Sequence, residues 1–145
     1  MFKKLNYKLT LILLSFSVLV GCAGTGTKNY GSINYEAPSD QAVVFVGRVN
    51  RYMASAGLVS IVLNGEEIGK LGIGEMERLN VAPGSHKIQT KIGNILQVGV
   101  GGDATAFVAK EGKKYFFLVD YDAGLFSAKW KIIETTESGF QGSLN

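Results

Sequence analysis

Cysteine, histidine and proline are scarce in this chain of 145 residues, which contains one cysteine, one histidine and two prolines. A single cysteine excludes an internal disulfide. One cysteine and one histidine also fall short of the three protein ligands that even a catalytic zinc site uses. Nucleophilic catalysis needs a base beside the nucleophile, and His86 is the one histidine that could supply it. We therefore expect no metal site built from histidine and cysteine.

The chain also lacks an apolar run that is long enough to cross a membrane. Its longest run is residues 9–20, which is interrupted by one threonine and two serines. Twelve residues span roughly 18 Å as a helix, whereas the hydrocarbon core of a bilayer is roughly 30 Å thick. Lys3, Lys4 and Lys8 precede the run, and no acidic residue does. A basic start followed by a short apolar segment is typical of a cleaved export signal.

The four residues at the end of this segment, Leu19-Val20-Gly21-Cys22, resemble the bacterial lipobox. The resemblance implies that the sulfur of Cys22 receives diacylglycerol, that residues 1–21 are removed as a signal peptide, and that the new amino terminus is acylated. Cys22 is the only cysteine, which fits this assignment. The alternative is an ordinary cysteine at the end of a secretory signal or a short membrane anchor. Two or more acyl chains would hold the protein stably on a membrane.

Net charge is lacking in the part of the chain that follows the signal. The whole sequence has 15 basic and 12 acidic residues, but three of the basic residues are the lysines of the signal. The remainder has twelve of each sign and is formally neutral. A nucleic-acid-binding domain would carry a basic surface, so we expect no nucleic-acid partner.

The segment from Cys22 to residue 41 is rich in glycine, serine, threonine and asparagine, which is a linker composition. We predict that residues 22–41 form the lipidated cysteine and a flexible tether with an r.m.s. reach of roughly 23 Å. The alternative is that Tyr30 and Tyr35 dock on the following domain and shorten the tether.

Residues 42–135 show the patterns of an all-β domain. Short segments rich in β-branched and aromatic residues alternate with turns that contain Gly, Pro or Asn. Ala42–Arg48 is apolar on both faces, which is typical of a strand that is covered on both sides. Asn64-Gly65 fits a tight hairpin turn. Seven or eight strands at this spacing predict an antiparallel β-sandwich or small barrel, and residues 136–145 are expected to form a loose tail.

Three motifs in the β-rich region resemble those of a known family. They are the segment from Ile61 to Gly69, the turn from Val81 to His86, and the segment from Gly112 to Phe116. In this order they are similar to a family of small bacterial envelope lipoproteins known as domain of unknown function twenty-eight forty-six, and the middle part is similar to the PEGA surface module. The resemblance covers roughly residues 42–134. It implies a β-sandwich on a lipid anchor and brings no catalytic residues.

Residues with recognisable chemistry are few. His86 lies at a strand start on the apolar side, so a structural role is expected. Residues 120–124 copy the first half of a calcium-binding loop, but the remaining ligands are missing, so we expect a plain turn. The glycines at 69–74 and 99–102 lack the features of a phosphate-binding loop. The acidic residues near the first hairpin are expected to be ordinary surface groups: Glu66, Glu67, Glu75 and Glu77.

Aromatic residues near the C-terminus are the strongest candidates for a binding surface. Tyr115 and Tyr121 lie in one predicted strand and its exit, and Phe126 and Trp130 lie in the next. Such residues can stack on sugar rings or on a partner peptide, although more often they form a core.

The sequence thus predicts a lipid-anchored, non-enzymatic protein of the bacterial envelope, with no cofactor and no metal. Its β-domain would serve for interaction, with an envelope protein or cell-wall glycan as partner, or for envelope maintenance. The alternatives are a module that binds cell wall or polysaccharide through exposed aromatics and an enzyme that uses a carboxylate pair. In a host with an outer membrane, Ala23 after the cysteine resembles the sorting pattern for that membrane's periplasmic face.

Overall fold

The structure is a computed structural model that describes residues 24–52, 57–92, 100–123 and 128–145. Eight of the strands in this part of the chain have five residues or more, and one has two. A 3₁₀ helix precedes the strands, and an α-helix follows them. In chain order the elements are η1 (Tyr30–Asn34), β1 (Ala42–Arg48), β2 (Val59–Leu63), β3 (Glu66–Leu71), β4 (Met76–Val81), β5 (Gly84–Ile92), β6 (Val100–Gly101), β7 (Ala104–Ala109), β8 (Lys114–Ala123), β9 (Ala128–Thr135) and α2 (Glu137–Leu144).

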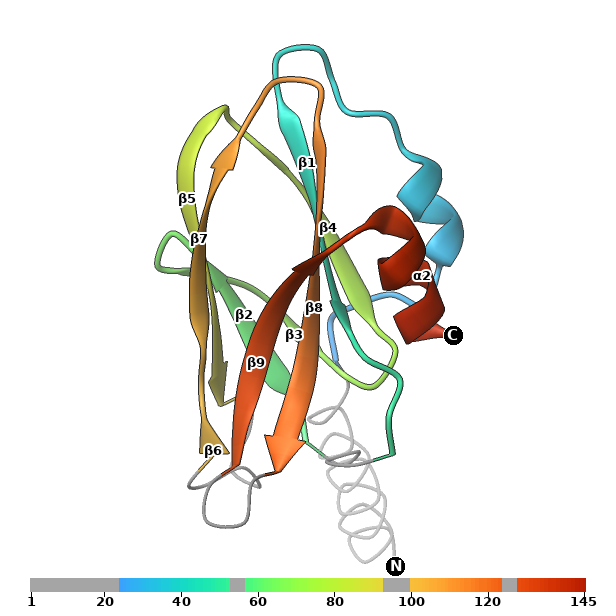
Figure 1. Ribbon diagram of the computed structural model, residues 1–145, viewed down its shortest axis with the longest axis vertical. Coiled ribbons are helices and arrows are strands. Elements are labelled where there is room, and N and C mark those ends of the chain that lie inside the picture. The colour runs from blue at the N-terminus through green and yellow to red at the C-terminus, as the bar shows by residue number, and fades with distance from the viewer. Residues whose placement is uncertain (1–23, 53–56, 93–99, 124–127) are drawn as a thin grey trace, which may run out of the picture.

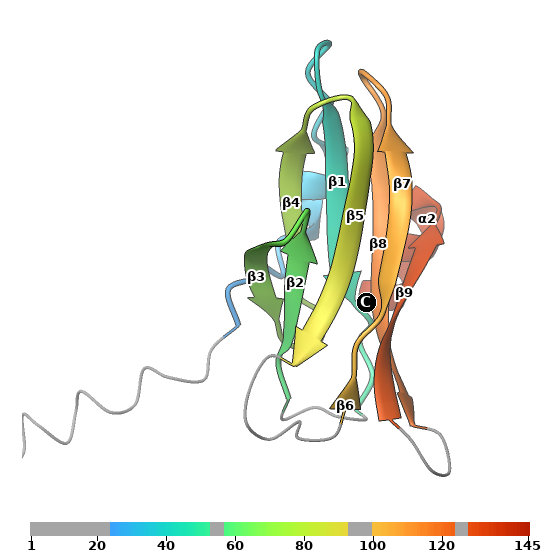
Figure 2. The ribbon, with the colours of Figure 1, turned by 90° about the vertical axis from the view of Figure 1, so that its left-hand side faces the viewer.

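The strands form two sheets that lie face to face (Figures 1 and 2). One sheet has the order β4-β1-β8-β9-β6, and the other has the order β3-β2-β5-β7. Pairing is antiparallel except between β1 and β8 and between β6 and β9, where it is parallel. The predicted all-β sandwich is therefore confirmed, and the arrangement is a sandwich rather than a closed barrel.

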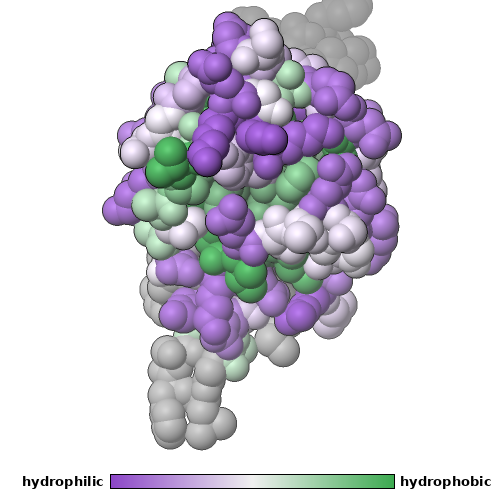
Figure 3. Space-filling model, turned by 45° about the horizontal axis from the view of Figure 1, so that its top comes forward, coloured by the Kyte–Doolittle hydropathy of each residue, from purple (hydrophilic) through white to green (hydrophobic). Residues whose placement is uncertain are grey.

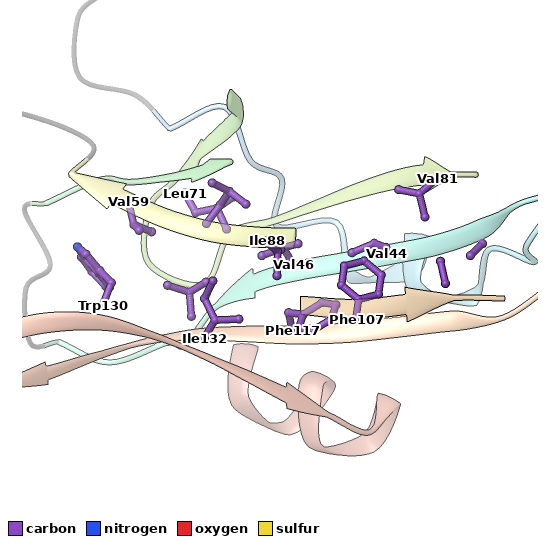
Figure 4. Packing of buried hydrophobic residues seen from close by; sticks show 14 residues of the cluster. Val44, Val46, Val59, Leu71, Val81, Ile88, Phe107, Phe117, Trp130 and Ile132 are labelled. Atoms are coloured by element: carbon purple, nitrogen blue, oxygen red, sulfur yellow. The ribbon is translucent and has the colours of Figure 1, made fainter. Parts of the chain in front are cut away.

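The inner core fills the space between the two sheets. Alternate residues of each strand point inward, as the period of two predicts. Figure 4 shows these side chains interdigitating, with Trp130 at one end of the core. Fully buried members come from both sheets and include Val44, Val46, Ile61 and Phe117.

Strand β1 is buried on both faces, as its sequence predicted. Val44 and Val46 point into the inner core, whereas Val43 and Phe45 belong to a second cluster on the outer face of the same sheet. Chain segments from both ends of the protein cover this outer face. The N-terminal side contributes Ile33, and α2 contributes Phe140 and Leu144. The molecule therefore has three layers around two cores.

The C-terminal tail is ordered, so the prediction of a loose tail at residues 136–145 is wrong. Thr136 caps α2, because its hydroxyl accepts a hydrogen bond from the backbone N–H of Gly139. Phe140 is fully buried and packs against Phe45 and Phe116, with ring centroids 6.4 and 5.4 Å apart. Gly47 makes this approach possible, since a Cβ there would lie 2.7 Å from the Phe140 ring. Tertiary packing, rather than helix propensity, stabilises this short helix.

Of two predicted turns, one agrees with the structure and one does not. Asn64 and Gly65 both have positive φ, at 52° and 93°, as the predicted hairpin turn requires. Residues 120–123, by contrast, continue strand β8, so the plain turn predicted there is wrong. The paired strand β9 explains the difference, because Asp120, Tyr121 and Asp122 lie opposite Lys131, Trp130 and Lys129.

Removal of the Phe140 ring tests the second core. Phe140→Ala should lower the free energy of unfolding by about 3–5 kcal/mol, because a buried aromatic ring is lost and a cavity remains. Urea unfolding followed by the fluorescence of Trp130, the one tryptophan, measures the change. Gln141→Ala, on the same helix, is the control and should change stability by less than about 0.5 kcal/mol. If the two substitutions lowered the free energy of unfolding equally, the packing of α2 on the sandwich would be contradicted.

Candidate functional site

The N-terminal residues pack on the sandwich, and we call residues 24–35 the strap. Thr25 pairs with the edge strand β3: its N–H donates to the carbonyl of Lys70 at 2.8 Å, and its hydroxyl accepts from the N–H of Lys70 at 2.8 Å. Gly24 lies so close to this edge that a Cβ there would be 2.9 Å from two backbone atoms, Gly72 N and Lys70 O. Glycine at position 24 is therefore a packing requirement as well as a linker residue.

The strap then crosses to the edge of the other sheet. Thr27 and Met76 exchange two backbone hydrogen bonds of 2.9 Å, which adds a bridge to β4. Ile33 is fully buried in the second core, and the Nζ of Lys114 donates to its carbonyl at 3.1 Å. The strap thus joins the open edges of both sheets on one side of the sandwich.

These contacts correct the predicted tether. Of residues 22–41, those from Gly24 onward are described, and Thr25, Thr27 and Ile33 are held by the contacts above. The docking of Tyr30 and Tyr35, which was the alternative, occurs instead. The guanidinium of Arg78 lies 4.0 Å from the centre of the Tyr35 ring, and Tyr30 packs at the second core. The Gly and Thr residues of this segment pair largely through backbone atoms. Such pairing does not require apolar side chains, so a composition that is typical of linkers did not reveal it.

Tyr30 connects the strap with both the sandwich and the C-terminal helix. Its hydroxyl lies 2.6 Å from the carbonyl oxygen of Gly74 and 3.0 Å from that of Leu144. Its single proton is shared between these two acceptors. Burial, followed by the nearby carboxylate of Glu75, raises the pKa of Tyr30 above its ordinary value. The hydroxyl therefore stays protonated and remains a donor.

Two acidic residues beside the strap serve as hydrogen-bond acceptors. Glu75 Oε2 accepts from the N–H of Gly72 at 2.8 Å, and Glu77 Oε1 accepts from the Thr25 hydroxyl at 3.2 Å. Burial raises the pKa of Glu77 above its ordinary value. The hydrogen bond from Thr25 lowers this pKa, and the negative charge of Glu75 raises it further. Both acids have partners within the fold, which is an ordinary structural role.

Arg48 closes the inner core at the end where the strap begins. Its side chain is 2% exposed, and its guanidinium lies 4.6 Å from the centre of the Trp130 ring. It donates to the carbonyl of Gly57 and, at 3.2 Å, to that of Leu71. Burial lowers the pKa of Arg48 to about 10, with the charge of Glu75 acting in the opposite direction. The group remains charged at neutral pH and is held by carbonyl oxygens and an aromatic face.

The aromatic residues predicted as a binding surface are largely structural. Trp130 is 1% exposed and points into the inner core (Figure 4). Tyr121 packs edge-on against Trp130 at 5.1 Å. Tyr115 lies beside Phe107, and its hydroxyl donates to Val108 O and accepts from Lys110 N, both at 3.0 Å. Phe126 lies outside the described residues. The three described side chains do not form an exposed stacking platform.

The anchor residues also lie outside the described part of the chain. Leu19, Val20, Gly21 and Cys22 precede Gly24, which is the first described residue. The lipidation of Cys22 therefore stays a prediction. Within the described residues, no helix is long and apolar enough to cross a membrane.

The remaining candidates show structural contacts. Both ring nitrogens of His86 are engaged at 2.8 Å, one with the side chain of Asn64 and one with the carbonyl of Ala82. The part of the chain that the structure describes holds no group of three His, Cys, Asp or Glu side chains suited to a metal ion.

Comparisons with known proteins do not add an identity. No family model matches the chain, and no curated protein matches it. The resemblance to a family of small envelope lipoproteins therefore remains a hypothesis that rests on the motifs themselves.

Exposed apolar side chains are few and scattered among hydrophilic ones. The large ones in the described ranges are Tyr52, Val108 and Ile133. Figure 3 shows apolar residues in the middle of one face, with hydrophilic residues around them.

Loss of the Tyr30 hydroxyl tests the strap. Tyr30→Phe should lower the free energy of unfolding by about 1–3 kcal/mol, because two buried carbonyl oxygens lose their shared donor. Urea unfolding followed by Trp130 fluorescence measures the effect. Tyr52→Phe is the matched control, since Tyr52 is 92% exposed, and it should change stability by less than about 0.5 kcal/mol. Equal stabilities of the two variants would show that the Tyr30 hydroxyl does not stabilise the docked strap.

Proposed function

We propose that this chain is a lipoprotein of the bacterial cell envelope, anchored through lipid on Cys22, whose sandwich is a non-catalytic interaction domain. The lipobox-like segment Leu19-Val20-Gly21-Cys22 carries the proposal, together with the basic and apolar residues before it. These residues have the order and composition of a lipoprotein export signal.

The position of the strap supports the proposal. Thr25 is exposed at the edge of the sandwich, and Cys22 is three residues before it in the chain. The first described residues thus lie at the surface of the domain, as an anchor three positions before Thr25 requires. In a host with an outer membrane, Ala23 favours attachment to the periplasmic face of that membrane.

The chemistry of the described surface favours a binding role over catalysis. Glu75 and Glu77 bond to the backbone and to the strap, and His86 has a partner at each ring nitrogen. A glycan-binding role would need exposed aromatic rings, and Trp130 is buried. We therefore propose an envelope protein as the partner.

Metabolic labelling with a fatty acid tests the anchor. In bacterial cells that express the full chain, labelled palmitate should be incorporated into the wild-type protein and lost from Cys22→Ala, because Cys22 is the attachment site. Ser15→Ala changes the apolar segment without altering the lipobox, so this control should be labelled like the wild type. Equal labelling of the wild type and Cys22→Ala would contradict the proposal.

A further inference from the structure

We infer that the edge of the sandwich formed by the strap, β3 and β4 lies directly against the membrane surface, because only three residue steps separate the lipidated cysteine from the docked Thr25. This inference rests on the proposed lipid anchor at Cys22 and adds an orientation to it. The membrane-facing surface is defined by Thr25, Lys28 and Lys70, and the occupant is a lipid surface.

The short length of chain between Cys22 and the docked strap is the first observation that supports the inference. Three residue steps separate Cys22 from Thr25, and an extended chain spans at most about 3.6 Å per residue, or about 11 Å in total. Thr25 is fixed to β3 by two hydrogen bonds of 2.8 Å with Lys70. A free tether of 18 residues would instead have an r.m.s. reach of roughly 23 Å. The domain therefore cannot move far from the lipid headgroups while the strap stays paired.

The strap is held at several points, so release of Thr25 alone would not free it. Thr27, two residues after Thr25, pairs with Met76. Tyr30 contacts the carbonyls of Gly74 and Leu144, and Ile33 is fully buried. The Gly24 backbone fits against Gly72 and Lys70, where a side chain would collide. Detachment would expose Ile33 and break pairing with both sheets.

The sheet order then determines which surfaces face toward and away from the membrane. In the second sheet, β3 and β7 are the opposite edge strands. In the first sheet, β4 forms one edge and the β9–β6 end forms the other. Because the strap binds β3 and β4, the β7 and β9 side lies farthest from the anchor. Figure 2 shows the strap next to β3, with β7 and β9 on the other side of the sandwich.

The exposed charges along this edge have both signs, because Glu66 and Glu67 of β3 are exposed together with the lysines. Lys28 is exposed, and the Lys70 side chain is 40% exposed and makes only a long contact of 3.8 Å with Glu67. Lysines near an anionic membrane surface are attracted to it and keep their charge in water.

Fluorescence quenching in vesicles tests this orientation. The lipidated full-length protein is reconstituted into phosphatidylcholine vesicles that contain a lipid with a nitroxide on its headgroup. Four variants each carry one new cysteine for a bimane label: Lys28→Cys, Lys70→Cys, Ala106→Cys and Lys113→Cys. If the sulfur of Cys22 is bonded to lipid, the new cysteine is the only free thiol.

Lys70 and Ala106 are a matched pair, because they lie on opposite edge strands of one sheet and on the same outer face. Lys70 on β3 pairs with Ser60 on β2, which in turn pairs with Lys91 on β5. Ala106 on β7 pairs with Lys87, which is four residues before Lys91 on β5 and therefore on the same face of the sheet. We expect quenching at positions 28 and 70 to be several-fold stronger than at 106 and 113. Insertion of about 20 Gly and Ser residues between Ala23 and Gly24 should remove the difference, because that spacer reaches roughly 25 Å.

Two outcomes would overturn the inference in distinguishable ways. Equal quenching at all four positions, in protein that stays bound to vesicles, would reject the orientation and leave the lipid anchor intact. Failure of the wild-type protein to carry fatty acid or to remain with vesicles would reject the anchor, and the orientation with it.

Discussion

Strand β1 is buried on both faces along its whole length, and the rest of the architecture depends on this burial. Its inward residues need the second sheet, and its outward residues need a further layer on the other side. That layer consists of the strap and helix α2, which meet over Val43, Phe45 and Phe116. Tyr30 joins the two segments through the carbonyls of Gly74 and Leu144. The segments that precede and follow the strands in the described chain are therefore parts of the fold.

This arrangement relates the fold to the proposed anchor. The residues that complete the second core are the same residues that connect the sandwich to Cys22. A domain that is held by a strap of this kind has a restricted orientation at a membrane, whereas a tethered domain rotates freely. The inner core ends at Arg48 and Trp130, and the charge of Arg48 is accommodated there by carbonyl oxygens and an aromatic ring.

The sequence was sufficient to predict the strands but not the segments that cover them. The bounds of β1 and the Asn64-Gly65 turn followed from local patterns, which depend on neighbouring residues. The parallel pairing of β1 with β8 could not be predicted, because it joins residues about 70 positions apart. The strap and α2 have weak local preferences, and Gly139 and Gly142 disfavour a helix. Their structure comes from packing on Phe45 and Phe116. Strand β8 is buried on both faces from Phe116 to Val119, because the third layer covers its outer face.

Hydrogen exchange of the strap amides tests the central claim most directly. The N–H groups of Thr27 and Met76 bond to each other's carbonyls, and these bonds exist only while the strap is docked. The account predicts that both amides exchange slowly, with protection approaching that of the amides in β1, since opening them requires exposure of the second core. Exchange of the Thr27 amide at the rate of an unstructured peptide, with β1 still protected, would contradict the account.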